Sequence, residues 1–68
     1  MNLPEALLNA KKYIREPKYF PREKLWAVER HTNKGWQAYY FYSEESAWME
    51  YYNQFRQIKQ ELLNDRSR

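Results

Sequence analysis

The 68-residue chain contains no cysteine, a single glycine and a single histidine. Without cysteine the protein has no disulfide bond and no thiolate ligand for a metal, and one imidazole cannot make a multi-histidine metal site. A single glycine cannot build a glycine-rich phosphate-binding loop, and no catalytic motif is present. We therefore expect no catalytic residue, no metal and no cofactor, and we predict that the protein is not an enzyme.

Long apolar segments are missing as well. No run of about 18 apolar residues occurs, so we expect no transmembrane helix. The N-terminal residues lack the basic and then apolar pattern of a signal peptide, and the absence of cysteine fits a reducing compartment. Together these absences predict a cytoplasmic protein.

Aromatic side chains are what the chain has in abundance. It contains thirteen Trp, Tyr and Phe residues, eight of them between positions 35 and 52. Residues 1–68 can form only a single small domain, whose core is expected to supply about 3–5 kcal/mol. Since each buried aromatic side chain removes roughly 150–250 Å² from water, aromatic bulk or a second chain is the expected source of stability.

Residues 3–15 are predicted to form a helix. Asn2 is a plausible N-cap with Glu5 three residues later, and apolar side chains recur at helical spacing as far as Ile14. Pro17 ends the helix, because the residue before a proline is biased away from helical conformation. Residues 16–24 then form an extended, proline-bracketed connector, in which Lys18–Phe20 could be a short edge strand.

Residues 25–32 and 36–42 are predicted to form an antiparallel hairpin. The turn at Thr32–Gly35 suits a type I turn followed by Gly35 in the left-handed region. The expected register pairs Thr32 with Trp36 and places Trp36 and Tyr40 on the same face as Trp26. Both faces are apolar near the open end of the hairpin, so each requires a cover.

Residues 44–63 are predicted to form a long amphipathic helix. Ser43 is its expected N-cap, and Glu44 and Glu45 lie in the first turn, where negative charge is favoured. The tail at residues 65–68 is expected to fray. The resulting fold class is α+β with the order α-β-β-α, and the two apolar hairpin faces together with an overhanging helix favour a homodimer.

The favoured function is that of a small accessory or regulatory protein that acts through protein–protein contacts as a homodimer. A domain with thirteen aromatic residues leaves some of them exposed, and exposed aromatic patches mark interaction sites. The competing interpretation is that the aromatic stripe of the long helix packs on its own hairpin. The candidate partner-binding residues are Trp36, Tyr40, Trp48, Tyr52 and Phe55.

The alternative function is nucleic-acid binding through residues 11–24, KKYIREPKYFPREK. This segment interleaves aromatic residues with cations, and cations contact phosphates while aromatic rings stack on unpaired bases. The competing interpretation is a solvated basic loop whose aromatic residues fold into the core. The candidate nucleic-acid-binding residues are Lys11, Lys12, Arg15, Lys18, Arg22 and Lys24.

Overall fold

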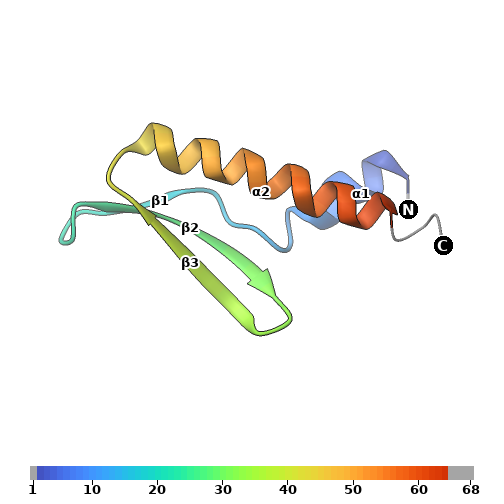
Figure 1. The fold of residues 1–68 in the computed structure, drawn as a ribbon, viewed down its shortest axis with the longest axis horizontal. Coiled ribbons are helices and arrows are strands. Elements are labelled where there is room, and N and C mark those ends of the chain that lie inside the picture. The colour runs from blue at the N-terminus through green and yellow to red at the C-terminus, as the bar shows by residue number, and fades with distance from the viewer. Residues whose placement is uncertain (1, 65–68) are drawn as a thin grey trace.

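The computed structural model describes residues 2–64, which form two helices and three strands (Figure 1). The strands make one antiparallel sheet in the order β1-β2-β3. The fold is α+β, as predicted, with a third strand added. Residues 65–68, the predicted frayed tail, lie outside the described residues. In chain order the elements are α1 (Leu3–Ala10), β1 (Lys18–Phe20), β2 (Leu25–Thr32), β3 (Gly35–Phe41) and α2 (Glu44–Asn64).

Helix α1 begins as predicted but ends at Ala10, five residues before the predicted end at 15. At its start the Glu5 amide donates to Asn2 Oδ1 at 2.9 Å. Beyond its end, the Arg15 amide donates to the Glu29 carbonyl at 2.9 Å and the His31 amide donates to the Tyr13 carbonyl at 2.7 Å. The prediction of helix for residues 11–15 is therefore wrong. The Lys12 and Tyr13 amides close turns onto the Asn9 and Ala10 carbonyls, and the chain then bonds to β2 through the Tyr13 carbonyl and the Arg15 amide.

Strand β1 confirms the short edge strand in the proline-bracketed connector. It pairs antiparallel with β2, with Lys18 opposite Ala27 and Phe20 opposite Leu25. Lys24 closes the turn between the two strands. It has a left-handed φ of 58°, and its amide donates a hydrogen bond to the Phe20 carbonyl at 2.8 Å. The hairpin thereby becomes a three-stranded sheet, which is more stable than an isolated hairpin in water.

The β2–β3 hairpin forms, but its register differs from the prediction by one residue. Thr32 pairs with Gly35 rather than Trp36. The Thr32 hydroxyl accepts from the Lys34 amide and donates to the Gly35 carbonyl, both at 3.1 Å, which holds a two-residue turn. Gly35 has the expected positive φ, 101°.

That one-residue difference moves the β3 side chains to the opposite faces, since side chains alternate along a strand. Trp26 now pairs with Phe41, and Val28 pairs with Tyr39. The predicted register placed Trp36 and Tyr40 on the face of Trp26, and this prediction is wrong. They lie on the other face, with Ala27.

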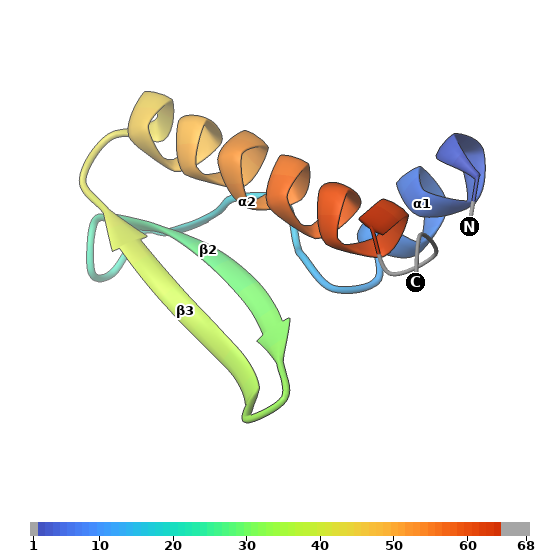
Figure 2. The ribbon, with the colours of Figure 1, turned by 45° about the vertical axis from the view of Figure 1, so that its right-hand side comes forward.

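Helix α2 covers the sheet face that carries Trp26, Val28 and Phe41 (Figure 2). Its bounds match the prediction closely, and the Ser43 hydroxyl caps its first turn by accepting from the Ser46 amide at 3.1 Å. Helix α1 lies beside the C-terminal half of α2 and packs against the part of that helix that was predicted to extend beyond the hairpin. The buried core residues are Ala10, Ile14, Val28, Ala47, Tyr51 and Ile58.

Two polar side chains are buried or partly buried between the sheet and α2. Arg30 Nη1 donates to Gln54 Oε1 and Nη2 lies 3.6 Å from Glu61 Oε2, so this β2 side chain is tied to two turns of the helix. Gln54 in turn donates to Glu50 Oε2 at 2.6 Å. Nearby, burial and then the Glu16 carboxylate raise the pKa of the Tyr51 phenol above its usual value of 10.0.

Substitution of Ile58 tests this core. Ile58 is 4% exposed, so Ile58→Ala is expected to lower the free energy of unfolding by about 2–5 kcal/mol. That is most of the stability expected of a domain this size, about 3–5 kcal/mol. Met49→Ala, on the exposed side of the same helix, is the matched control and should change stability by less than about 0.5 kcal/mol. Urea unfolding followed by circular dichroism measures both, and equal effects would contradict the assigned core.

Candidate functional site

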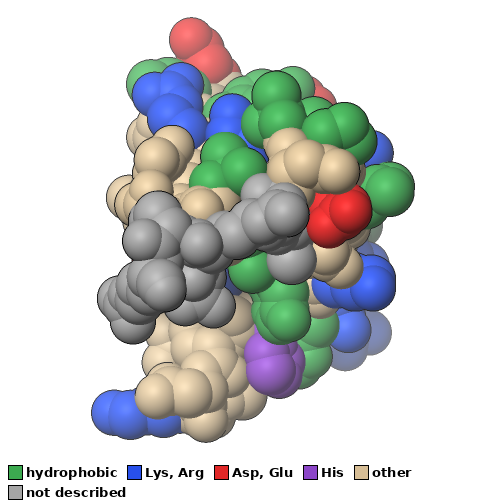
Figure 3. Space-filling model, turned by 90° about the vertical axis from the view of Figure 1, so that its right-hand side faces the viewer, with side chains coloured by type: hydrophobic (Ala, Val, Ile, Leu, Met, Phe, Trp, Pro, Cys, Tyr) green, Lys and Arg blue, Asp and Glu red, His purple; other side chains and the backbone are tan. Residues whose placement is uncertain are grey.

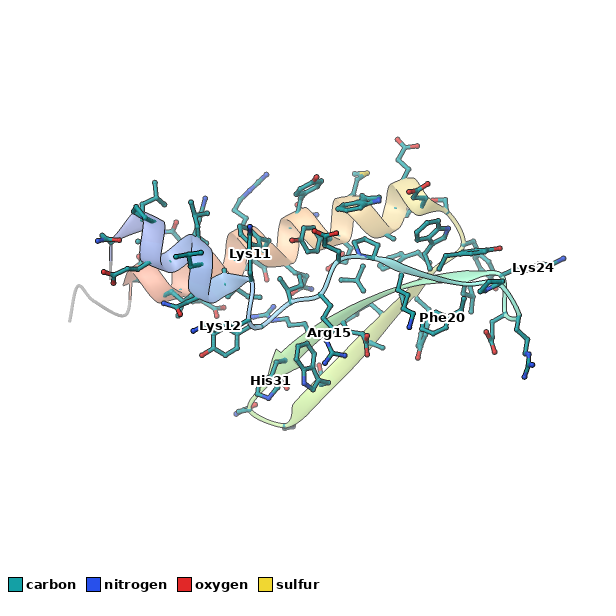
Figure 4. All side chains as sticks on the ribbon, turned by 180° about the vertical axis from the view of Figure 1, so that it is seen from behind. Lys11, Lys12, Arg15, Phe20, Lys24 and His31 are labelled. Atoms are coloured by element: carbon teal, nitrogen blue, oxygen red, sulfur yellow. The ribbon has the colours of Figure 1, made fainter. Side chains whose placement is uncertain are left out.

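The sheet face opposite α2 is not covered by either helix in the described part of the chain, and we call it the open face. Trp36 is 43% exposed, Tyr40 63% and Tyr13 40%. Figure 4 shows Arg15, Phe20 and His31 projecting on the side away from α2. The strand registers and side-chain contacts assign these residues to the open face: Tyr13, Arg15, Lys18, Phe20, Leu25, Ala27, Glu29, His31, Trp36, Ala38 and Tyr40.

Near the hairpin turn, five of these side chains form a group that we call the Trp36 cluster: Tyr13, Arg15, Glu29, His31 and Trp36. Arg15 Cζ lies 4.1 Å from the centroid of the Trp36 ring, a cation–π contact. His31 meets Trp36 edge-on, with ring centroids 5.2 Å apart, and the Tyr13 centroid is 6.1 Å from that of His31. Arg15 Nη1 also lies 3.5 Å from Glu29 Oε1. The cluster thus presents ring faces and a guanidinium plane on one exposed surface.

At the other end of the open face, Phe20 on β1 and Tyr40 on β3 flank a hollow over Leu25. We call it the Phe20–Tyr40 slot; Glu23 completes its lining, and its volume is about 370 Å³. Two strand spacings separate its walls, about 10 Å. Lys18 Nζ lies 5.4 Å from the Phe20 ring centroid. The slot therefore combines an aromatic side chain on each side, an apolar floor and an adjacent cation, and at this separation a planar ring that enters it lies against one wall.

Charge is segregated between the two sides of the sheet. Arg15 and Lys18 lie on the open face, and Arg22, Lys24 and Lys34 lie in the turns that border it. Two glutamates lie among them: Glu23 in the β1–β2 turn, and Glu29, which is paired with Arg15. On the other side, four glutamates and two cations are carried by α2: Glu44, Glu45, Glu50, Glu61, Arg56 and Lys59. The open face is therefore the electropositive side of the described structure.

The six candidate nucleic-acid-binding cations follow the connector from end to end instead of forming one patch. Lys11 and Lys12 lie at the end of α1, and Lys24 projects from the β1–β2 turn at the opposite end of the molecule (Figure 4). Arg15 and Lys18 are the two that the structure places on the open face. Arg22 lies beside Lys24 in the β1–β2 turn.

The five candidate partner-binding residues divide between two surfaces. Trp36 and Tyr40 lie on the open face, four residues apart on β3. On α2, Trp48 and Tyr52 have ring centroids 5.7 Å apart, and Tyr52 is 57% exposed. Phe55 packs against the buried core. No single surface of residues 2–64 brings all five together.

The structure places two aromatic residues of the basic segment 11–24, Tyr13 and Phe20, on the open face. His31, which lies beside Tyr13, was not assigned to a site from the sequence. Tyr13 belongs to the stretch predicted as helix, residues 3–15. The alternation of Tyr13, Ile14 and Arg15, polar or aromatic outward and apolar inward, is the pattern of an extended segment. That alternation was the available indication that these residues extend the sheet.

A larger hollow of about 750 Å³ lies between the end of β2 and the C-terminal turns of α2, where Arg30, His31, Ile58 and Glu61 are among its lining residues. Within positions 2–64, no group of three or more His, Asp or Glu side chains is arranged to hold a metal ion. Neither described helix is long and apolar enough to cross a bilayer.

Comparisons with protein-family models, with curated proteins and with solved structures find no match to this chain. The function must therefore be inferred from the open face and its surroundings.

The Trp36 cluster yields a prediction about stability. Arg15 is largely exposed, so Arg15→Gln and Trp36→Leu should each lower the free energy of unfolding by less than about 1 kcal/mol. A double-mutant cycle should give a coupling energy of roughly 0.5–1 kcal/mol from the cation–π contact. Urea unfolding of the wild type, both single variants and the double variant measures this coupling. A coupling energy of zero would show that the two side chains do not interact in solution.

Proposed function

We propose that this is a non-catalytic protein that binds single-stranded nucleic acid on its open face. The observation that supports this best is the interleaving of exposed aromatic rings with cations on one uncovered sheet face. Base faces stack on aromatic rings and guanidinium planes, while lysine and arginine contact phosphates. Both kinds of group occur on the open face at each of two places, the Trp36 cluster and the Phe20–Tyr40 slot.

The two places have distinct roles in this proposal. In the Phe20–Tyr40 slot a base inserts against the ring of Tyr40, which is 63% exposed, and Lys18 contacts the phosphate beside it. In the Trp36 cluster a second base stacks on the Arg15 guanidinium, which lies over the Trp36 ring. Trp36 and Tyr40 are four residues apart on one strand, about 13 Å. A short stretch of single strand along β3 reaches both.

A single strand suits this surface better than a duplex. The rings of Trp36 and Tyr40 lie on a sheet face, and stacking on them requires bases that are free of a partner strand. No helix of the described chain carries a row of cations that would enter a major groove. The positive open face, backed by the acidic α2, would attract a polyanion to this side of the molecule.

A protein partner is the second candidate function, and a different surface favours it. Leu3 is 51% exposed and Leu8 67% exposed on α1, and Figure 3 shows hydrophobic side chains gathered at this end of the molecule. Exposed apolar patches mark protein contacts. An accessory or regulatory role through this end is compatible with nucleic-acid binding on the open face. A cytoplasmic location remains a prediction from the absence of cysteine.

Salt dependence tests the proposed function. Binding of a fluorescein-labelled single-stranded oligonucleotide, followed by anisotropy, is expected at low salt and should weaken as salt rises. With three or four phosphates neutralised, the slope of log K against log salt should be roughly −2 to −3. The matching duplex is the comparison and should bind more weakly. No binding at low salt, or tighter binding to the duplex, would contradict the proposal.

A matched pair of tyrosines tests the surface. Tyr40→Ser removes one wall of the slot and should weaken binding by about 1–3 kcal/mol, roughly 5- to 150-fold. Tyr52→Ser is the control, because Tyr52 is 57% exposed on α2, close to the 63% of Tyr40. Glu29→Gln removes a negative charge from the open face and should strengthen binding. If Tyr52→Ser weakens binding as much as Tyr40→Ser, the interface is not the open face.

A further inference from the structure

Strand β3 forms one edge of the sheet, and its sequence does nothing to protect that edge. Its seven residues, GWQAYYF, contain no charged residue and no proline. The opposite edge is protected: β1 has three residues, lies between Pro17 and Pro21, and carries Lys18. Edge strands that lack charge and proline pair readily with another strand. The contrast between the two edges indicates that the outer edge of β3 is a site for pairing with another strand.

The backbone groups at this edge can be assigned from the hydrogen bonds of β2. Glu29 and His31 bond to the segment at residues 13–15, on the β1 side. Since successive residues of a strand direct their N–H and C=O groups to opposite sides, Val28 and Arg30 bond to β3. Their partners there are Tyr39 and Gln37. The backbone groups of Trp36, Ala38 and Tyr40 consequently point outward, away from β2.

These outward groups are self-complementary about the middle of the strand. Ala38 is the central residue of Gly35–Phe41. A two-fold axis perpendicular to the sheet, midway between the two copies of Ala38, pairs Ala38 with its own copy and Trp36 with Tyr40 of the second copy. Each of these pairs joins outward-pointing residues, so each exchanges both N–H···O bonds of an antiparallel ladder. The same axis brings aromatic rings opposite each other, a favourable cross-strand pair.

Charge and space at the edge also fit a second copy. No like charges meet along the paired strands, because β3 has none. Lys34, one residue before β3, would lie at the end of the second copy's strand, where Glu44 and Glu45 begin α2. Helix α2 leaves β3 at its C-terminal end and runs back over β2 toward α1, away from the outer edge of β3 (Figures 1 and 2). No strand of the described residues pairs with the outer edge of β3.

We propose that two copies of this chain pair through β3 in antiparallel register centred on Ala38, forming one continuous six-stranded sheet. Both copies of α2 then lie on one side of the sheet and both open faces lie on the other. The proposal rests on the backbone of β3 and does not depend on nucleic-acid binding, since it is tested without nucleic acid. A single strand pair is a small interface, so the dissociation constant is expected to be on the order of micromolar.

The oligomeric state is measured by sedimentation equilibrium at high micromolar concentration. The wild type should approach twice the monomer mass of 8.6 kDa. Ala38→Lys puts two like charges directly opposite each other at the two-fold axis and should give a monomer. Ala38→Glu should do the same, and an equimolar mixture of the two variants should recover the dimer. Asn53→Lys, an exposed position on α2, is the control for added charge and should remain dimeric.

Amide hydrogen exchange of the wild type supplies a readout that needs no variant. In the dimer, the Trp36, Ala38 and Tyr40 amides should be protected, and their protection should fall on dilution. The Gln37 and Tyr39 amides bond within the hairpin and should stay protected at every concentration. A wild type that is monomeric at high micromolar concentration would overturn the proposal. So would a dimer that persists in Ala38→Lys, or one that leaves those three amides unprotected, because its contact would lie elsewhere.

Discussion

One helix can cover only one face of this sheet, and most other features of the molecule depend on that constraint. Helix α2 has 21 residues and is about 32 Å long. That length lets it cross one face of the sheet, and a single straight helix cannot also cover the other face. Helix α2 packs on one face of the sheet (Figure 2), so the described residues form two layers only. The core is accordingly small, and Val28 is its one large side chain that is completely buried among the described residues. No helix of the described residues lies above the aromatic residues on the second face.

The register of the hairpin decides which aromatic residues are left there. With Thr32 opposite Gly35, Tyr39 and Phe41 lie on the helix side, and Trp36 and Tyr40 lie on the open face. The cations of the preceding connector reach the same face, because Tyr13–Arg15 bonds to β2 as an extended segment. Arg15 thereby lies over Trp36, although the two residues are far apart in sequence. The surface is a product of pairing between distant segments.

Local chemistry predicted the elements whose causes are local. The Asn2 and Ser43 caps, the periodicity of α2, the positive φ of Gly35 and the edge strand between two prolines all follow from short segments. The register did not, because a two-residue and a three-residue turn both suit Thr32–Gly35, and the Thr32 hydroxyl bonds to Lys34 and Gly35 favour the shorter one. The end of α1 depended on hydrogen bonds to β2. Trp36 and Tyr40 were predicted to share a face with each other, but not with Arg15 and Lys18.

The central claim is that the open face, and not the helical side, is the binding surface. The three tryptophans report on it directly: Trp36 lies on the open face, while Trp26 and Trp48 pack on the side of α2. In a titration with a single-stranded oligonucleotide, followed by the indole N–H signals in ¹⁵N–¹H spectra, the account predicts a large shift for Trp36 and small shifts for the other two. A dominant shift of Trp26 or Trp48, or no shift of any of the three, would contradict it.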